Sequence, residues 1–104
     1  MFNKKLEETL THLGSKYSVR NFDYEPCIYR KFGNYEIEVS GLTSSGKYNA
    51  TIYVWENEIR VVESIQNIHS KEELAKHLET VFAKYPDNLD RLLNTSISCR
   101  WFFY

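Results

Sequence analysis

The sequence predicts an α+β domain in two layers, with an N-terminal helix, a four-stranded antiparallel meander, two C-terminal helices and a candidate terminal strand. Two changes of period carry this prediction. Apolar residues recur every three to four positions toward both ends of the chain, as in amphipathic helices, whereas between Cys27 and Ile65 they alternate with polar residues. Turn-forming residues separate the alternating segments, so we expect hairpin connections.

Length and composition favour a single domain. The chain has 104 residues, of which 42% are hydrophobic and 26% charged, so we expect residues 1–104 to form one globular unit. Thirteen Lys and Arg residues against 14 Asp and Glu residues give a net charge of -1, which excludes a strongly basic DNA-coating protein. Every apolar run is far shorter than the roughly 18 residues that cross a bilayer, and the charged N-terminus does not resemble a signal peptide. We expect a cytoplasmic protein that does not bind membranes.

The first helix is predicted by four apolar residues that share one face, namely Phe2, Leu6, Leu10 and Leu13. Gly14 would end this helix. The next segment, 15–26, mixes polar and aromatic residues, and Pro26 disfavours a helical conformation of the residue before it. We therefore expect an ordered connector that is held in place by its aromatic side chains.

The meander is predicted from its turns. Gly33-Asn34 is a two-residue hairpin turn, which places Phe32 opposite Tyr35 and Tyr29 opposite Glu38. The core face would then carry Ile28, Phe32, Tyr35, Ile37, Val39, Tyr48, Ala50, Ile52 and Val54. We expect the loop around residues 42–46 to be exposed, with the next strand starting near Lys47.

A third hairpin is expected at Asn57-Glu58. A two-residue turn there would place Val61 opposite Val54 and Arg60 opposite Trp55. Glu63 then falls on the core side of the sheet, which indicates a bulge or an early end of the strand.

The C-terminal part begins with the strongest helix signal. Ser70 and Glu73 form a capping box, followed by an apolar stripe up to Pro86 that comprises Leu74, Leu78, Val81, Phe82 and Tyr85. Asp87 would cap a third helix that carries Leu89, Leu92 and Leu93. Residues 95–104 alternate again, with Ile97, Cys99, Trp101 and Phe103 on one side, so we expect a last strand docked on the sheet or across a dimer interface.

Catalytic and cofactor motifs are missing from the sequence. No phosphate-binding loop, nucleophile elbow or dinucleotide fingerprint is present, and two cysteines and three histidines without ligand spacing predict no metal site. Glu36 and Glu38 would share a strand face, as paired glycosidase carboxylates do, but Lys31 opposite Glu36 favours a solvated ion pair. We expect a protein that is not an enzyme and has no cofactor.

The non-core face of the meander is the candidate site. In the predicted register it mixes aromatic and charged residues, namely Tyr29, Lys31, Glu36, Glu38, Thr51, Tyr53, Trp55, Arg60 and Val62. Tyr, Trp and Arg are enriched at protein contacts, whereas a face that only meets water is rich in Lys, Glu, Ser and Thr. We interpret Tyr29, Lys31, Glu36, Glu38, Tyr53, Trp55 and Arg60 as partner-binding residues.

Two alternatives make the same residues structural. The C-terminal aromatic residues 101–104, or the aromatic connector, would cover this face and turn Tyr53 and Trp55 into ordinary core. Trp55 and Arg60 would also form a cation–π pair that only stabilises the hairpin.

The function that these observations favour is a small non-catalytic module that binds a host or self-encoded protein and acts by occluding its surface. Eight Tyr and few Pro are typical of accessory proteins of phages and mobile elements, so we expect an inhibitor of a host defence or regulatory protein, in the style of anti-CRISPR proteins. The alternative is a single-stranded nucleic-acid-binding protein, with bases stacked on the same aromatic residues and phosphates contacted by Arg30, Lys31 and Arg60. Glu36 and Glu38 oppose that alternative electrostatically. The chain would be a monomer or a homodimer.

Overall fold

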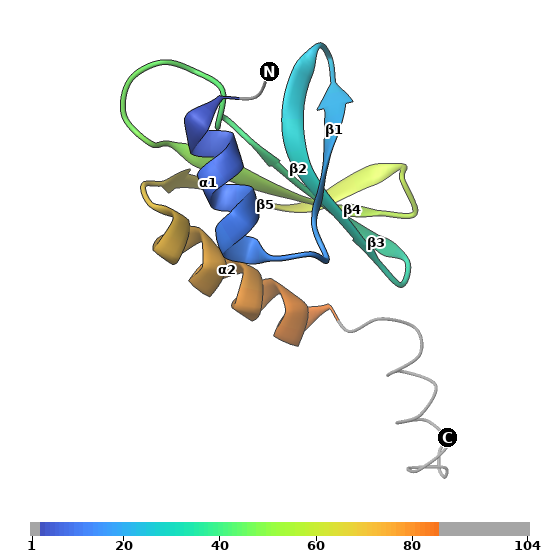
Figure 1. Ribbon diagram of the computed structural model, residues 1–104. Helices are drawn as coiled ribbons and strands as arrows, with labels where there is room; N and C mark the ends of the chain where they lie inside the picture. The colour runs from blue at the N-terminus through green and yellow to red at the C-terminus, as the bar shows by residue number, and fades with distance from the viewer. Residues whose placement is uncertain (1–2, 86–104) are drawn as a thin grey trace, which may run out of the picture.

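The computed structural model describes residues 3–85 and shows one sheet with a helix at each end of the chain segment (Figure 1). The elements are α1 (Lys4–Leu13), β1 (Ser18–Phe22), β2 (Glu25–Phe32), β3 (Tyr35–Ser40), β4 (Ala50–Glu56), β5 (Arg60–Ile68) and α2 (Lys71–Lys84). The strands form an antiparallel sheet in the order β1-β2-β3-β4-β5. The predicted α+β class is thereby confirmed. The predicted helix after Asp87 and the strand at residues 95–104 lie outside the described residues.

The sheet has five strands rather than the predicted four. The additional strand is β1, which comes from the segment that we interpreted as a connector. Asp23 and Tyr24 form the turn with φ angles of 52° and 68°, so that Phe22 pairs with Glu25. A positive φ is uncommon for residues other than Gly, and therefore this turn has no obvious sequence signature.

The β2–β3 hairpin has the predicted register. Phe32 pairs with Tyr35, Tyr29 pairs with Glu38, and Ile28 pairs with Val39. The turn is possible because Gly33 adopts a φ of 58°, which costs little without a Cβ atom. This hairpin places alternate residues of β2 and β3 on opposite faces, as expected.

The connection between β3 and β4 differs from the expected exposed loop. Its first residue, Gly41, has a φ of 86°, and a Cβ atom there would lie 2.5 Å from the Asn49 carbonyl oxygen. Leu42 is fully buried and anchors the loop to the core, whereas residues 44–47 are exposed. As a result, β4 begins at Ala50 and not at Lys47.

The β4–β5 turn corrects the predicted register by one residue. It contains three residues, 57–59, and Arg60 therefore pairs with Glu56 while Val61 pairs with Trp55. The Asn57 amide donates to the Asn34 carbonyl oxygen at 2.8 Å, so a contact with the β2–β3 turn holds this conformation. The predicted bulge is confirmed, because the register shifts again between Val54 and Trp55 and returns Glu63 to the core side.

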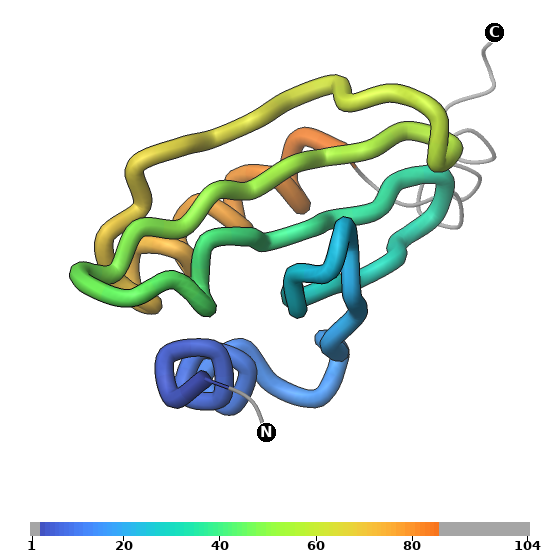
Figure 2. Tube along the Cα trace, turned by 90° about the horizontal axis from the view of Figure 1, so that it is seen from above, coloured from blue at the N-terminus to red at the C-terminus, as the bar shows by residue number. Residues whose placement is uncertain are grey.

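Both helices pack against the same face of the sheet, and Figure 2 shows α2 behind the strands and α1 beside them. The fully or almost fully buried core comprises Leu6, Ile28, Phe32, Ile37, Val39, Leu42, Ala50, Ile52, Val54, Ile68, Leu74, Leu78 and Val81. Ser70 is the N-cap of α2 as predicted, since its hydroxyl accepts from the Glu73 amide at 3.0 Å, and the Glu73 carboxylate accepts from the His69 amide at 2.9 Å instead of from Ser70. Within residues 3–85 no helix is long and apolar enough to cross a membrane.

Candidate functional site

The open face of the sheet is the face opposite α1 and α2. Strand pairing places on it Arg20 and Phe22 of β1, Glu25, Cys27, Tyr29 and Lys31 of β2, Glu36, Glu38 and Ser40 of β3, Thr51, Tyr53 and Trp55 of β4, and Val61 of β5. In Figure 1 the β1–β2 hairpin stands steeply against β4 and β5. The sheet is therefore strongly twisted, and its open face is concave.

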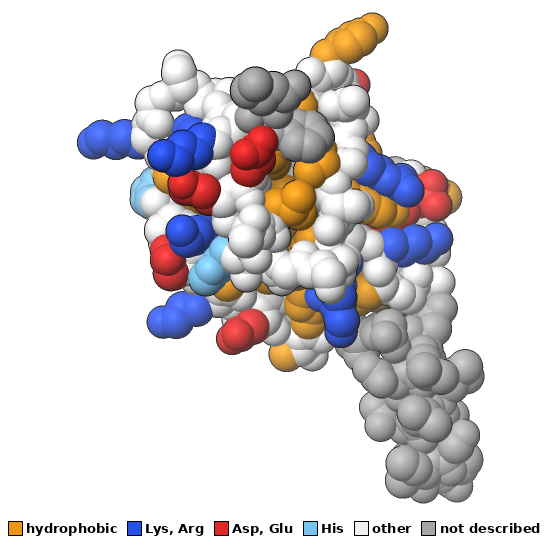
Figure 3. Space-filling view, viewed as in Figure 1, with side chains coloured by type: hydrophobic (Ala, Val, Ile, Leu, Met, Phe, Trp, Pro, Cys, Tyr) orange, Lys and Arg blue, Asp and Glu red, His pale blue; other side chains and the backbone are white. Residues whose placement is uncertain are grey.

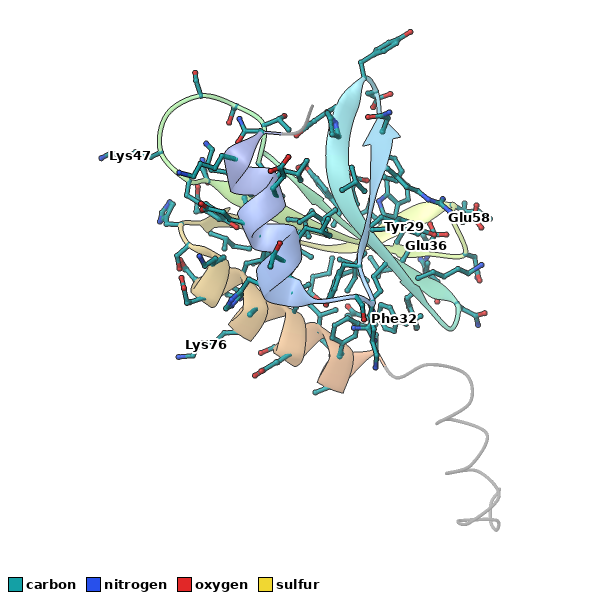
Figure 4. All side chains as sticks on the ribbon, in the orientation of Figure 1. Tyr29, Phe32, Glu36, Lys47, Glu58 and Lys76 are labelled. Atoms are coloured by element: carbon teal, nitrogen blue, oxygen red, sulfur yellow. The ribbon has the colours of Figure 1, made fainter. Side chains whose placement is uncertain are left out.

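Two adjoining hollows occupy this concave face. The first, of about 220 Å³, is lined by Arg20, Phe22, Tyr29, Glu36, Glu38, Trp55 and Glu58. The second, of about 440 Å³, is lined by Phe22, Asp23, Glu25, Glu38, Ser40, Tyr53, Trp55 and Val61. Because Phe22, Glu38 and Trp55 line both hollows, they form one groove between the β1–β2 and β4–β5 hairpins. Figure 4 shows Tyr29, Glu36 and Glu58 close together on this side of the molecule.

Trp55 and Glu38 form the centre of the groove. The Trp55 indole Nε1–H donates to Glu38 Oε1 at 3.1 Å, which fixes the orientation of both half-buried side chains. Burial raises the pKa of the Glu38 carboxyl, although the hydrogen bond from Trp55 acts in the opposite direction. The hydrogen bond from Trp55 therefore offsets only part of the cost of removing water from the Glu38 carboxylate.

Tyr29 lines one wall of the groove but is itself almost completely buried. Only 7% of the residue is exposed, because the Arg20 guanidinium lies 4.0 Å from the centre of its ring and Phe22 packs at 6.3 Å. Its hydroxyl donates to Glu36 Oε2 at 2.9 Å. Burial and the hydrogen bond to Glu36 raise the pKa of Tyr29. We therefore correct its predicted role from an accessible anchor to a residue that positions Glu36.

The charges around the groove are strongly biased toward acid. Its lining contains five acidic side chains and one basic side chain, Arg20, whereas the whole chain is almost neutral. At the side of β1 and the β4–β5 hairpin, Figure 3 shows both basic and acidic side chains next to hydrophobic ones. Lys31 lines an adjoining hollow at the β2–β3 turn, which shares Glu36 and Glu58 with the groove. The groove is therefore a local negative surface with aromatic walls.

Five of the predicted partner-binding residues meet in the groove, namely Tyr29, Glu36, Glu38, Tyr53 and Trp55. Arg60 does not belong to this group. It pairs with Glu56 in the strand register and forms an ion pair with that carboxylate at 2.7 Å. The one-residue shift at the β4–β5 turn moves Arg60 to the other face, so the predicted cation–π pair with Trp55 is wrong.

Two further predictions about this face need correction. Lys31 pairs with Glu36 in the register, but among residues 3–85 no ion pair forms between them, and Glu36 binds the Tyr29 hydroxyl instead. Val62 is the additional residue of the bulge and packs against the core cluster. On β5, Val61 and Ser64 pair with the open-face residues Trp55 and Tyr53.

Arg20 and Phe22 were not predicted to belong to the site, because we placed them in a connector. A weak signal was available, since Tyr17 and Val19 alternate with Ser18 and Arg20 in the period of a strand. The connector does not turn Tyr53 and Trp55 into core, because both line the groove; its residue Phe22 instead packs on Tyr29. Residues 101–104, the other proposed cover, lie outside the described residues.

The groove presents aromatic, apolar and carboxylate side chains. Cys27 lies beneath it, and burial, with the charges of Glu25 and Glu38, raises the pKa of its thiol to about 12, so it is not a nucleophile at neutral pH. Over residues 3–85, no three His, Cys, Asp or Glu side chains converge to hold a metal ion. Comparison of the chain with protein-family models, curated proteins and solved structures finds no match in any of the three.

Proposed function

We propose that this chain is a small non-catalytic module that binds another protein through the groove on the open face. The observation that carries the proposal is the placement of exposed apolar side chains. Within the described residues, the exposed large apolar side chains are Tyr24, Ile59 and Val61, and all three lie in the two hairpins that border the groove. Val61 lines the groove itself beside Tyr53 and Trp55, and apolar area next to aromatic side chains is typical of the core of a protein-contact site.

The aromatic residues of the groove support the same proposal. Tyr53 and Trp55 are only half-buried, and they lie on the side of the sheet that neither helix covers. Such residues contribute large apolar area with a polar group, and they dominate the energetics of many protein interfaces. Binding by surface coverage needs no catalytic group. The form of the proposal that we carry forward is an inhibitor of a host defence or regulatory protein, encoded by a phage or mobile element.

A protein partner is favoured over single-stranded nucleic acid by the positions of the cationic residues. Arg30 lies on the helix side, with its guanidinium 4.1 Å from the ring centre of Phe82, and Arg60 is paired with Glu56. Of the predicted phosphate contacts, only Lys31 remains on the open face. The acidic lining would repel phosphates, because backbone contacts dominate nucleic-acid affinity.

The proposal is tested by affinity capture from a lysate of the source cells. The Tyr53→Ala/Trp55→Ala variant removes the exposed aromatic area, and Lys76→Ala/Thr80→Ala changes exposed positions of α2 as a matched control. We expect the wild type and the control variant to retain the same partner, and the groove variant to lose it with an unchanged far-UV spectrum. Full retention by a folded groove variant would refute the proposal.

A second titration separates the protein partner from nucleic acid. The NMR resonance of the Trp55 indole, assigned with a Trp55→Phe variant, is followed while short oligonucleotides are added at low salt, where phosphate contacts are strongest. We expect no saturable shift. A saturable shift that disappears at high salt would support nucleic-acid binding instead.

A further inference from the structure

We propose that the groove binds a basic segment of the partner protein, with an arginine or lysine side chain inserted beside Trp55 and next to Glu36 and Glu38. This inference rests on the proposed function and specifies the chemistry of the partner. It follows from the shape of the groove, the charges that line it and a contact that the chain already makes within itself.

Charge complementarity selects a cationic occupant. Five acidic side chains and one basic side chain line the groove, although the chain as a whole carries a net charge of only -1. The acidic excess is therefore concentrated on the face that lacks a helix cover. Acidic and partly apolar surroundings attract a cation and disfavour an anionic segment, because complementary potentials determine which partners dock.

The aromatic wall already holds a guanidinium. Arg20 lies over the Tyr29 ring at 4.0 Å, and the hydroxyl of that same tyrosine contacts Glu36. This intramolecular contact places a guanidinium on the face of a ring whose hydroxyl is bound to a carboxylate. Trp55 with Glu38 repeats the combination on the next strand, where the lining contains no second basic side chain. Tryptophan is the aromatic side chain that binds cations best.

The carboxylates are positioned before any partner binds. One oxygen of Glu38 accepts from the Trp55 indole and one oxygen of Glu36 accepts from the Tyr29 hydroxyl. Each carboxylate has about four acceptor positions, so both retain capacity for a guanidinium or ammonium donor. The first hollow, of about 220 Å³, is several times the roughly 30 Å³ that a single water takes up. A long basic side chain can therefore replace several waters there.

The direct test uses three short acetylated peptides of equal length, built from Gly and Ser around a pair of Arg, Gln or Glu residues. Each is titrated into isotope-labelled full-length protein while the Trp55 indole and the backbone amides of residues 36–38 are observed. We expect saturable shifts with the Arg peptide, which weaken as salt is added, and none with the Glu peptide. Equal shifts with the Gln and Arg peptides would overturn the inference.

Variants with matched charge make the test specific to the groove. Glu36→Gln/Glu38→Gln should weaken binding of the Arg peptide by about tenfold or more, which corresponds to 1.4 kcal/mol. Glu7→Gln/Glu79→Gln changes the net charge equally at exposed helix positions and should leave the affinity within about twofold, because exposed distant charges contribute little. Arg20→Gln should strengthen binding, since it removes the one positive charge from the lining. Weaker binding of the Arg peptide to Arg20→Gln would contradict the proposed charge preference.

The captured partner distinguishes failure of this inference from failure of the proposed function. Loss of the partner from the Tyr53→Ala/Trp55→Ala variant, with full retention by Glu36→Gln/Glu38→Gln, would keep the groove as the contact surface and refute a cationic occupant. Retention by both folded variants would refute the contact surface itself. Loss from both, together with retention by Glu7→Gln/Glu79→Gln, is the outcome that we expect.

Discussion

The helix-covered face and the open face of this sheet are built from alternate residues of the same strands. On the covered face, Ile37, Ile52 and Val54 have no exposed surface and pack in the hydrophobic core cluster. On the open face, Glu38 and Trp55 are half-buried and lie in a groove. Burial of the first set stabilises the fold, whereas the second set combines apolar area with charge that water still reaches. This difference supports the proposal that the open face binds a partner.

Two glutamates show the same difference on a smaller scale. Glu63 lies on the core side and accepts from the Tyr85 hydroxyl at 2.9 Å and from Lys84 Nζ at 3.2 Å. These contacts lower its pKa, with the hydrogen bond from Tyr85 as the main cause. The pKa of Glu38 is instead raised, mainly by burial. Contacts within the chain therefore stabilise the ionised form of Glu63, whereas the contacts of Glu38 offset only part of the cost of burying its charge.

The largest expected contrast between the faces is between neighbours on β4. Ile52→Ala should lower the free energy of unfolding by about 2 to 5 kcal/mol, because it removes a fully buried side chain from the core. Tyr53→Ala should cost about 1 kcal/mol or less, since that side chain is half-exposed on the open face. Urea denaturation measures both. Equal costs would show that Tyr53 is structural and would remove the contrast.

The next largest effect is expected at the end of β3, where a backbone amide binds a side chain of the open face. The Gly41 amide donates to Glu25 Oε2 of the open face at 2.7 Å, and a Cβ atom on Gly41 would lie 2.5 Å from the Asn49 carbonyl oxygen. Gly41→Ala should therefore cost more than Gly46→Ala, whose φ of 95° is also positive but whose Cβ would meet nothing within 4 Å. We expect about 1 kcal/mol for Gly46→Ala from backbone strain, and about 1 to 3 kcal/mol more for Gly41→Ala. Thermal unfolding with equal losses would show that the loop can shift to admit the methyl group.

A smaller effect on stability, of opposite sign, is expected when Glu63 and Glu38 are each replaced by Gln. Ionised Glu63 has a lowered pKa, so it stabilises the fold above the usual glutamate pKa of about 4.3, and this contribution is lost as the pH falls through its folded pKa. Glu38 has a raised pKa, so its protonated form favours folding, and this contribution is lost as the pH rises through its folded pKa.

At pH 7, Glu63→Gln should therefore destabilise the protein and Glu38→Gln should leave it unchanged or stabilise it. Both effects should be below about 1 kcal/mol, because the carboxylates are partly exposed, and both should shrink at about pH 4. Melting temperatures at the two pH values provide the measurement. Destabilisation of similar size by both variants would contradict the distinction between the glutamates.

The smallest effect is expected at Arg60. Its side chain is 71% exposed, and its ion pair with Glu56 lies at the hairpin end rather than in the groove. Arg60→Ala should change the free energy of unfolding by less than about 0.5 kcal/mol and leave partner capture unchanged. Loss of the partner from this variant would return Arg60 to the contact surface.

The sequence was sufficient where local chemistry determines structure. Gly33 supplies the positive φ of the β2–β3 turn, and Ser70 with Glu73 caps α2, so both elements were predicted correctly. The β2–β3 hairpin already positions Tyr29, Glu36 and Glu38. Pairing of opposite residues follows directly once the turn is known.

The sequence was not sufficient to predict turns whose conformation depends on residues far away in the chain. The β4–β5 turn depends on a hydrogen bond from Asn57 to the carbonyl of Asn34, which no local pattern encodes. That turn shifts the register by one residue and moves Arg60 to the other face. The β1–β2 turn places a tyrosine, Tyr24, at positive φ, so β1 and its contribution to the groove were missed.

Site-specific photocross-linking in the source cells tests directly whether the groove contacts the partner. A photoreactive phenylalanine analogue is placed at Tyr53 in the groove or at Lys76, which Figure 4 shows on the outer side of α2. We predict that the analogue at position 53 cross-links a partner through a peptide that contains arginine or lysine. The analogue at position 76 should cross-link none. Cross-linking of the partner from position 76 and not from position 53 would contradict it.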